Sequence, residues 1–233
     1  MSFKPEYFGL KRDCLYEIIA TTYSITDNEK AIHPNASCMG IRLIDNNNLQ
    51  IIPFYTTSTY KNLKANNIIA INFIDDIYLY ALAALKDPHS SIGLIEFPSK
   101  YYSYKYFDFL VSDIPYIKKA WGLLLGRVLQ EFQKTKKDEL GDINVPVFKL
   151  DVIFNKKFHE SYKLFNRAEN LTLETIILAT RLKIAKKQKN QYLFSKLYEK
   201  MRDHIENIER FGKNKKVLKT IELVSSYMKK LME

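Results

Sequence analysis

Residues 53–72 constrain the fold most, because within twenty residues they pass from a strand to a helix and back to a strand. The apolar residues of 49–55 predict a strand, and the four hydroxyl residues 56–59 follow it directly. Residues 60–66 then have a short helical pattern, and residues 68–73 form a second apolar run. Hydroxyl groups ahead of a helix lie beside the unpaired N–H groups of its first turn. Such a corner suits an anion, above all a phosphate.

Two interpretations of this hydroxyl cluster are open. In the first, Thr56, Thr57 and Thr59 hold a phosphate together with Lys61, which adds a full positive charge one turn into the helix. In the second, the threonines only end the strand and cap the helix, which is a common role for threonine. Lys61 and Lys64 are then ordinary surface lysines.

The segments before the cluster predict an antiparallel meander. Residues 14–23 and 36–44 are rich in β-branched and apolar types, so each predicts a strand, and residues 45–48 read as a hairpin turn. Together with residues 49–55 and 68–73 they make four short strands joined by tight connections. Strands in this arrangement typically close into a small barrel.

The rest of the chain changes character after residue 158. Residues 77–85 predict a helix capped by Asp75 or Asp76, and the aromatic-rich residues 89–117 have no clear pattern. Residues 120–133 and 145–154 predict a long hairpin. Three helices follow, with apolar stripes in the last two, and residues 166–169 resemble a capping box. We therefore expect an α+β fold with a barrel domain at residues 1–158 and a helical part at residues 159–233.

Charge and cysteine content narrow the function classes. The net charge is +10, and residues 183–233 carry 14 Lys or Arg against 6 Asp or Glu, so most of the excess lies in the predicted helices. A solvated helical face accounts for this more simply than a nucleic-acid groove does. Two cysteines without a CxxC motif fit a reducing cytoplasm. We expect a cytoplasmic protein, because no run approaches the roughly 18 apolar residues of a membrane helix.

The common catalytic and nucleotide-binding motifs are missing from the sequence. It contains no G-x-G-x-x-G, no P-loop, no G-x-S-x-G and no H-E-x-x-H. The four histidines are far apart, so we expect no metal site, and no residue stands out as a catalytic acid or base. If the protein is an enzyme, a cofactor supplies the difficult chemistry.

A flavin mononucleotide (FMN) matches the predicted corner and the strand beside it. Its phosphate needs N–H donors, hydroxyl groups and a cation, which residues 56–61 offer. Its ring needs close approach to a strand, and the small side chains of Ser37, Cys38, Met39 and Gly40 allow one. Arg42 follows two residues later and reaches the same phosphate if its side chain points inward.

Several motifs resemble those of an archaeal family known as domain of unknown function 447. The resemblance rests on H-P-N-A-S-C-M-G-I-R, P-F-Y-T-T-S-T-Y-K-N-L, A-I-N-F-I-D-D and the later F-N-R-A-E-N-L-T-L-E-T-I-I-L-A-T-R-L. It covers residues 14–76 and 165–182 well and the aromatic middle loosely. The family's proteins are FMN-binding split β-barrels related to pyridoxamine-phosphate oxidases and flavin reductases.

This resemblance implies a split β-barrel with a C-terminal helical extension and a homodimer with FMN at the subunit interface. It implies that Thr56, Thr57, Thr59 and Lys61 hold the phosphate and that residues 37–40 line the ring. The oxidase relatives have an arginine beside the lysine of this corner, whereas this chain has Tyr60. That departure argues against transferring the oxidase substrate.

We therefore expect an FMN-dependent oxidoreductase that uses a small-molecule substrate or a nicotinamide donor. A flavin carrier without turnover is the first alternative. Nucleic-acid binding through the basic helices is the second, although no nucleic-acid motif is present. The sequence leaves open the substrate, the electron donor, and the roles of residues 89–117 and of Asn166 and Arg167.

Overall fold

The fold is known from a computed structural model, which describes residues 3–12, 14–25, 31–86, 94–138, 141–161, 167–211 and 215–233. The chain divides into two compact units. The barrel unit comprises Met1–Ile74 and Pro98–Ser161, and the helical unit comprises Asp75–Phe97 and Tyr162–Glu233. The α+β class predicted from the sequence is confirmed.

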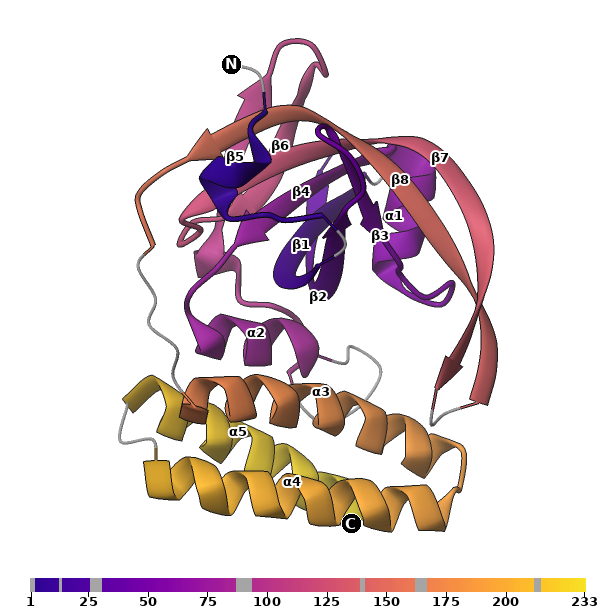
Figure 1. The fold of residues 1–233 in the computed structure, drawn as a ribbon, viewed down its shortest axis with the longest axis vertical. Helices are drawn as coiled ribbons and strands as arrows, with labels where there is room; N and C mark the ends of the chain where they lie inside the picture. Colours follow the sequence, from indigo (N-terminus) through magenta and orange to yellow (C-terminus); the bar gives the residue numbers. More distant parts are fainter. Residues whose placement is uncertain are drawn as a thin grey trace. The chain divides into compact units, whose positions relative to one another are not determined.

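The barrel unit is built on six antiparallel strands that close in the order β1-β2-β3-β8-β7-β4 (Figure 1). Their bounds are β1 (Leu15–Ile25), β2 (Ile32–Leu43), β3 (Asn48–Ile51), β4 (Ile68–Phe73), β7 (Gly122–Asp138) and β8 (Gly141–Lys157). A 3₁₀ turn (Pro5–Phe8) precedes β1, and helix α1 (Ser58–Asn66) connects β3 to β4. The predicted meander is therefore present, and the predicted long hairpin forms β7 and β8.

Alternate residues of these strands fill the barrel. Ile18, Ile41, Ile51, Ile71 and Phe148 come from five different strands and are fully or almost fully buried in one core cluster. The period-two alternation of a strand sends their neighbours in sequence to the outer face. There a second cluster forms around Tyr23, Ile68 and Leu123. Burial on both faces explains why residues 68–71 are apolar without alternation.

A two-stranded sheet covers part of that outer face. It consists of β5 (Tyr102–Phe107) and β6 (Ser112–Ile117), after a 3₁₀ turn at Ser99–Tyr101. Asn72 ties it to the barrel, because its side-chain amide donates to Ile19 O (2.8 Å) and its Oδ1 accepts from Ile117 N (2.7 Å). The sequence left this aromatic segment unassigned. Its aromatic side chains are common in strands, but which residues pair with one another depends on how the whole chain folds.

The structure corrects the predicted bounds of β3. We expected the strand to run over residues 49–55, but it ends at Ile51. Pro53 has no N–H to donate to a neighbouring strand, and residues 55–57 turn toward α1. Phe54 and Tyr55 are consequently exposed by 41% and 38% instead of packing into the barrel.

Strand β2 also differs from the prediction, because it begins at Ile32 and not at residue 36. It pairs with β1 from Ile32 to Arg42, but with β3 only over Ile41–Leu43. Among the described residues, no strand pairs with this second edge over residues 32–40. Pro34 is tolerated within the strand because a proline without an N–H fits at an edge. Strand β2 therefore presents an open backbone edge.

The helical unit consists of α2 (Ile77–Ala84), α3 (Arg167–Lys187), α4 (Gln191–Phe211) and α5 (Lys215–Met232). Figure 1 shows α3, α4 and α5 side by side. The apolar stripe predicted for the last helix is confirmed, since its five members are buried: Val217, Ile221, Val224, Met228 and Leu231. None of the helices that the structure describes is both long and apolar enough to cross a membrane.

Helix α2 begins as predicted at an aspartate cap. The Asp76 carboxylate accepts from Tyr78 N (3.2 Å) and forms an ion pair with Lys216 on α5 (3.1 Å). This helix belongs to the helical unit, although the sequence analysis placed residues 75–97 in the barrel domain. The boundary expected after residue 158 stays a prediction. Asn166, in the proposed capping box, lies outside the described residues.

Candidate functional site

The predicted corner at residues 56–61 is the N-terminus of helix α1. Thr57 is the N-cap: its Oγ1 accepts from Tyr60 N (3.2 Å) and donates to Phe54 O (2.7 Å). Thr57 N also donates to Phe54 O (3.0 Å). The side chain of Thr57 thus shapes the turn that leads into the helix, and the capping interpretation holds for this residue.

The remaining groups of the corner face solvent. Thr56, Ser58 and Lys61 are exposed, and Ser58 was not among the residues that we predicted. The first N–H groups of a helix have no intrahelical acceptor, so those at the start of α1 add donors to the two hydroxyl groups. Lys61 lies one turn into the helix. This donor set, two hydroxyls, main-chain amides and an ammonium group, is one that suits a phosphate.

Thr59, in contrast, points into the protein. Its side chain is 1% exposed, and its Oγ1 donates to Ser37 Oγ on β2 (3.1 Å). The side-chain amide of Asn35 lies 3.2 Å from Thr59 Oγ1 and 3.3 Å from Ser37 Oγ. Thr59 therefore joins the helix to the strand, which is a positioning role and not that of a solvent-facing ligand.

The same hydrogen-bond network extends to β1. The Asn35 side-chain nitrogen lies 3.3 Å from Thr22 Oγ1, and the buried Asn62 of α1 donates to that same oxygen (3.1 Å). Thr22, Asn35, Ser37, Thr59 and Asn62, which we call the α1–β2 network, thus connect one helix to two strands. Because α1 is anchored at two of its residues, its N-terminus is fixed beside the open edge of β2.

The second lysine of α1 is occupied by a partner within the barrel. Lys64 forms an ion pair with Glu131 on β7 (2.7 Å), and Tyr60 donates to the other carboxylate oxygen (3.2 Å). The hydrogen bond to Glu131 raises the pKa of Lys64, and partial burial followed by that carboxylate raises the pKa of Tyr60. Glu131 offsets the charge of Lys64, which leaves Lys61 as the cation that the corner offers to a ligand.

The residues predicted to line a ring lie on two faces of β2. Ser37 pairs with Ala20 and Met39 pairs with Ile18, on the face that carries the barrel core. By alternation, Cys38 and Gly40 lie on the opposite face. Residues 37–40 therefore do not form one surface of side chains. What they share is the backbone edge of β2, which is open beside α1.

Arg42 and Gly40 share the outer face, away from Ser37. A Cβ atom added at Gly40 would lie 2.7 Å from Leu15 Cδ1, so the glycine makes room for a side chain of β1. Arg42 is exposed and pairs with Leu15 across the strands. The structure thus brings Thr56, Thr57 and Lys61 together at the corner and links Thr59 to Ser37, but it separates Arg42 from that group.

Two hollows described by the structure lie away from this corner. One, of about 400 Å³, is in the barrel unit between the N-terminal segment and Leu43, Asn46 and Arg12. The other, of about 390 Å³, is in the helical unit. Thr56, Ser58 and Lys61 are exposed, so the donors of the corner lie at the surface along the start of α1.

Comparison with known proteins gives the fold. Residues 16–96 match the family described as "Protein of unknown function (DUF447) N-terminal domain". The matched range runs from β1 to beyond α2 and so contains the corner. An FMN-bound protein of the same family from Methanosarcina mazei is 19% identical, and the match covers 95% of this chain and 98% of that one with a TM-score of 0.70. No protein of curated function matches the chain.

More distant structures are flavoproteins and flavin reductases. A flavoredoxin from Methanosarcina acetivorans is 14% identical over 65% of this chain and 72% of that one, with a TM-score of 0.41. The flavin reductase of styrene monooxygenase from Pseudomonas putida is 10% identical over 61% and 81%, with a TM-score of 0.41. The resemblance predicted from the sequence is confirmed by the first comparisons: residues 16–96 match the model of the DUF447 N-terminal domain, and the chain has the fold of a solved protein described with that family.

Proposed function

We propose that this protein binds FMN, with the phosphate at the N-terminus of α1 and the ring along the open edge of β2. The observation that carries the proposal is the hydrogen bond of 3.1 Å between Thr59 and Ser37. It holds a phosphate-type donor set directly beside the edge of β2 that pairs with no described strand over residues 32–40. A ligand with an anionic tail and a flat, polar-edged ring matches both parts. The FMN bound to the similar protein from Methanosarcina mazei supports the same choice.

The residues of the corner then have distinct roles. Thr56, Ser58 and the first amides of α1 donate to the phosphate oxygens, and Lys61 offsets their charge. Thr57 sets the turn through its hydrogen bonds to Tyr60 N and Phe54 O. Thr59 acts through its hydrogen bonds with Ser37 and Asn35, which makes it a positioning residue and not a phosphate ligand.

The residues of the strand edge would interact with the ring mainly through their backbone. In an antiparallel ladder, the N–H and C=O groups of alternate residues point away from the partner strand. Along residues 37–40 such groups can pair with the ring's carbonyls and N3–H. This arrangement needs no particular side chain at Cys38 or Gly40, which fits their place on the outer face of β2.

We propose further that the bound flavin makes the protein an oxidoreductase. When bound, FMN accepts or passes on a hydride, and the protein tunes the ring through burial and hydrogen bonds. A reduced nicotinamide or a small organic molecule is the expected donor. The second subunit of a homodimer would cover the ring, and the exposed Phe54 and Tyr55 beside the corner offer apolar surface for that contact.

One preparation of the protein tests these proposals in turn. An absorbance spectrum and mass spectrometry of the small molecule released on denaturation are expected to identify FMN. Retention of no flavin, together with no binding of added FMN, would refute the proposed ligand. Anaerobic addition of NADH or NADPH is then expected to bleach the flavin band near ~450 nm. A band that persists with both donors would favour a flavin carrier over the nicotinamide-dependent oxidoreductase.

The expected assembly is tested separately by sedimentation equilibrium of the flavin-loaded protein. A homodimer is predicted to have twice the mass of the 27.4 kDa chain. A monomer that still retains FMN would refute the shared interface and leave the proposed ligand standing.

A further inference from the structure

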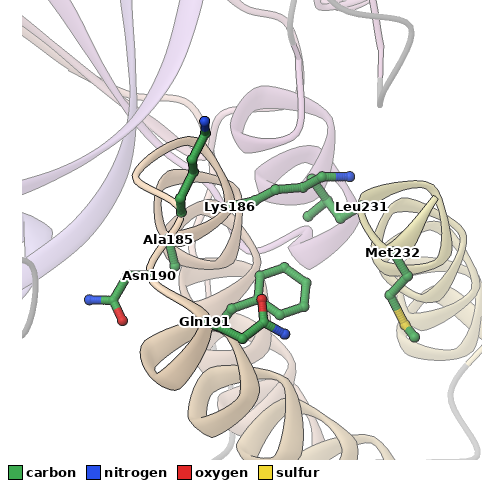
Figure 2. A pocket seen from close by; sticks show the side chains of 8 residues that line it. Ala185, Lys186, Asn190, Gln191, Leu231 and Met232 are labelled. Carbon is green, nitrogen blue, oxygen red and sulfur yellow. The ribbon is translucent and has the colours of Figure 1, made fainter.

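A hollow of about 390 Å³ lies in the helical unit, at the end where α3 turns into α4 and α5 finishes. Its lining is Ala185, Lys186, Lys189, Asn190, Gln191, Phe194, Leu231 and Met232. Figure 2 shows Leu231 and Met232 of α5 across the hollow from Ala185 and Gln191. The volume falls in the roughly 300–1,000 Å³ range of small-molecule sites. The proposed flavin site uses none of these residues.

The floor of the hollow is apolar. Ala185 is fully buried and Leu231 is 2% exposed, whereas Met232 is 60% exposed at the rim. The Phe194 ring stacks on Tyr198 with an interplanar angle of 11°, which fixes its orientation. An apolar chain laid against these side chains would bury them from water, and the flexible thioether of Met232 can adapt to its shape.

The rim of the hollow is cationic. Lys186 and Lys189 are both exposed, and none of the eight lining residues is acidic. Glu233, which follows Met232 in the chain, is the acidic residue nearest to the lining in sequence. Two ammonium groups above an apolar floor are complementary to a ligand with an apolar body and one anionic end.

The turn between α3 and α4 places the second lysine in an unusual backbone conformation. Lys189 N donates to Lys186 O (3.0 Å) and Asn190 N donates to Ala185 O (3.0 Å), which is the Schellman pattern of a helix end. Lys189 occupies the left-handed position of that pattern, with φ of +54°. Glycine adopts this conformation at the lowest cost, so a lysine here is unfavourable for the turn itself. We therefore attribute the presence of a lysine at this position to a role of its side chain and not to the backbone conformation.

We propose that this hollow binds a small amphipathic carboxylate, with the carboxylate between Lys186 and Lys189 and the apolar chain over Phe194, Leu231 and Met232. The proposal does not depend on flavin binding. It predicts that affinity needs both parts of the ligand, because the lysines alone are solvated surface charges and the floor alone selects no anion.

The turn provides an informative variant, Lys189→Gly. It removes one cation and installs the residue that the left-handed position favours, so the helical unit is expected to be at least as stable as in the parent. Lys187→Ala is the matched control, because Lys187 lies in the last turn of α3 and does not line the hollow. Met232→Ser tests the apolar contact at the rim, at an exposed position where a substitution is expected to leave folding intact.

The test is isothermal titration calorimetry of the full chain with octanoate, with 1-octanol and acetate as probes that each lack one part of the ligand. Octanoate is expected to bind more tightly than either. Lys189→Gly is expected to weaken octanoate binding ~5-fold, since a surface ion pair contributes up to about that factor. Met232→Ser is expected to weaken octanoate binding as well. Lys187→Ala is expected to match the parent.

Several results would overturn the proposal. If octanoate does not bind at millimolar concentration, the proposed site does not exist. Acetate as tight as octanoate would mean ion pairing without a site, and octanol as tight as octanoate would mean an apolar surface without anion recognition. An equal loss in Lys187→Ala and Lys189→Gly would trace the effect to net charge. Thermal unfolding followed by circular dichroism confirms that each variant is folded.

Discussion

Replacing Asn35 with alanine tests whether the α1–β2 network holds the corner in place. The side-chain amide of Asn35 lies within 3.2–3.3 Å of three hydroxyl oxygens, those of Thr22, Ser37 and Thr59. An amide nitrogen has two hydrogens, so at most two of these hydrogen bonds are made at one time. The substitution therefore removes up to two hydrogen bonds that the Asn35 side-chain nitrogen donates.

The expected loss of unfolding free energy depends on which hydrogen bonds of the network remain after the substitution. A net hydrogen bond contributes about 0.5–1.5 kcal/mol, which gives an upper range of about 3 kcal/mol for two. The three hydroxyls keep other partners, because Asn62 donates to Thr22, and Thr59 donates to Ser37. None of them is left buried without a hydrogen bond, so we expect the lower part of the range, about 1–2 kcal/mol.

Trp121 makes the measurement specific to the barrel unit. It is the single tryptophan of the chain, and it stacks on Phe73 with ring centroids 5.1 Å apart. Urea unfolding of the flavin-free protein, followed by tryptophan fluorescence, is expected to give a lower midpoint for Asn35→Ala with an unchanged slope.

The control is Asn46→Ala, which removes an exposed asparagine whose Oδ1 accepts from Arg12 (2.9 Å). A surface change of this kind is expected to stay within about 0.5 kcal/mol. If Asn35→Ala also stays within about 0.5 kcal/mol, the network does not anchor α1 as described.

Three further changes test other parts of the structure. Thr57→Ala is expected to lower the free energy of unfolding of the barrel unit, measured in urea, by about 1 kcal/mol. Thr57→Ser is expected to retain it, because serine keeps the capping oxygen. Equal losses in the two variants would exclude capping as the cause. Asp76→Ala removes the N-cap of α2 and the ion pair with Lys216. It is expected to lower the free energy of unfolding of the helical unit by about 1–2 kcal/mol, monitored by circular dichroism. An unchanged unfolding free energy would refute the stabilising role of Asp76. Burial, and then the nearby Lys200, lowers the pKa of His204 below its usual 6.5. Between the lowered pKa of His204 in the folded protein and its usual value of 6.5, the unfolded chain binds more protons than the folded one. The stability of the fold with a neutral His204 is therefore fully present above pH 6.5 and is lost as the pH falls through the folded pKa. His204→Gln is expected to flatten that dependence, and an unaltered pH profile would contradict it.

The helices and strands could be predicted from the sequence wherever a regular apolar pattern is compatible with only one kind of secondary structure. The 4-3-4-3 apolar spacing from Val217 to Leu231 has one helical interpretation, and all five residues are buried. The turn at residues 45–48 forms between β2 and β3 as expected. The end of β3 was missed because apolar residues continue past Ile51, although Pro53 could have indicated it.

The composition of the corner was predictable, but the orientation of each side chain was not. Thr56, Thr57 and Thr59 are consecutive or nearly so, and their hydroxyl groups face solvent, the helix cap and the sheet respectively. Which of these directions a residue takes depends on the strand that α1 packs against. Asn35 was part of the quoted motif but was not selected, because its three acceptors come from distant segments of the chain.

The separation of residues 37–40 onto two faces could have been predicted. Successive side chains of a strand alternate, so Ser37 and Cys38 cannot both face the same ligand through their side chains. What the sequence did not indicate is that β2 has a strand neighbour on one side only over this range, since that depends on how far β3 extends.

The most direct test of phosphate binding at the start of α1 compares FMN with riboflavin, which lacks the phosphate, in the parent protein and in Lys61→Ala. Loss of one charged hydrogen bond costs about 1.5–3 kcal/mol of binding free energy. Lys61→Ala is therefore expected to weaken FMN binding by ~10- to 150-fold and to leave riboflavin binding unchanged. Dissociation constants from quenching of flavin fluorescence give all four values. An equal weakening of both ligands, or an FMN affinity that Lys61→Ala leaves unaltered, would contradict phosphate binding at this corner.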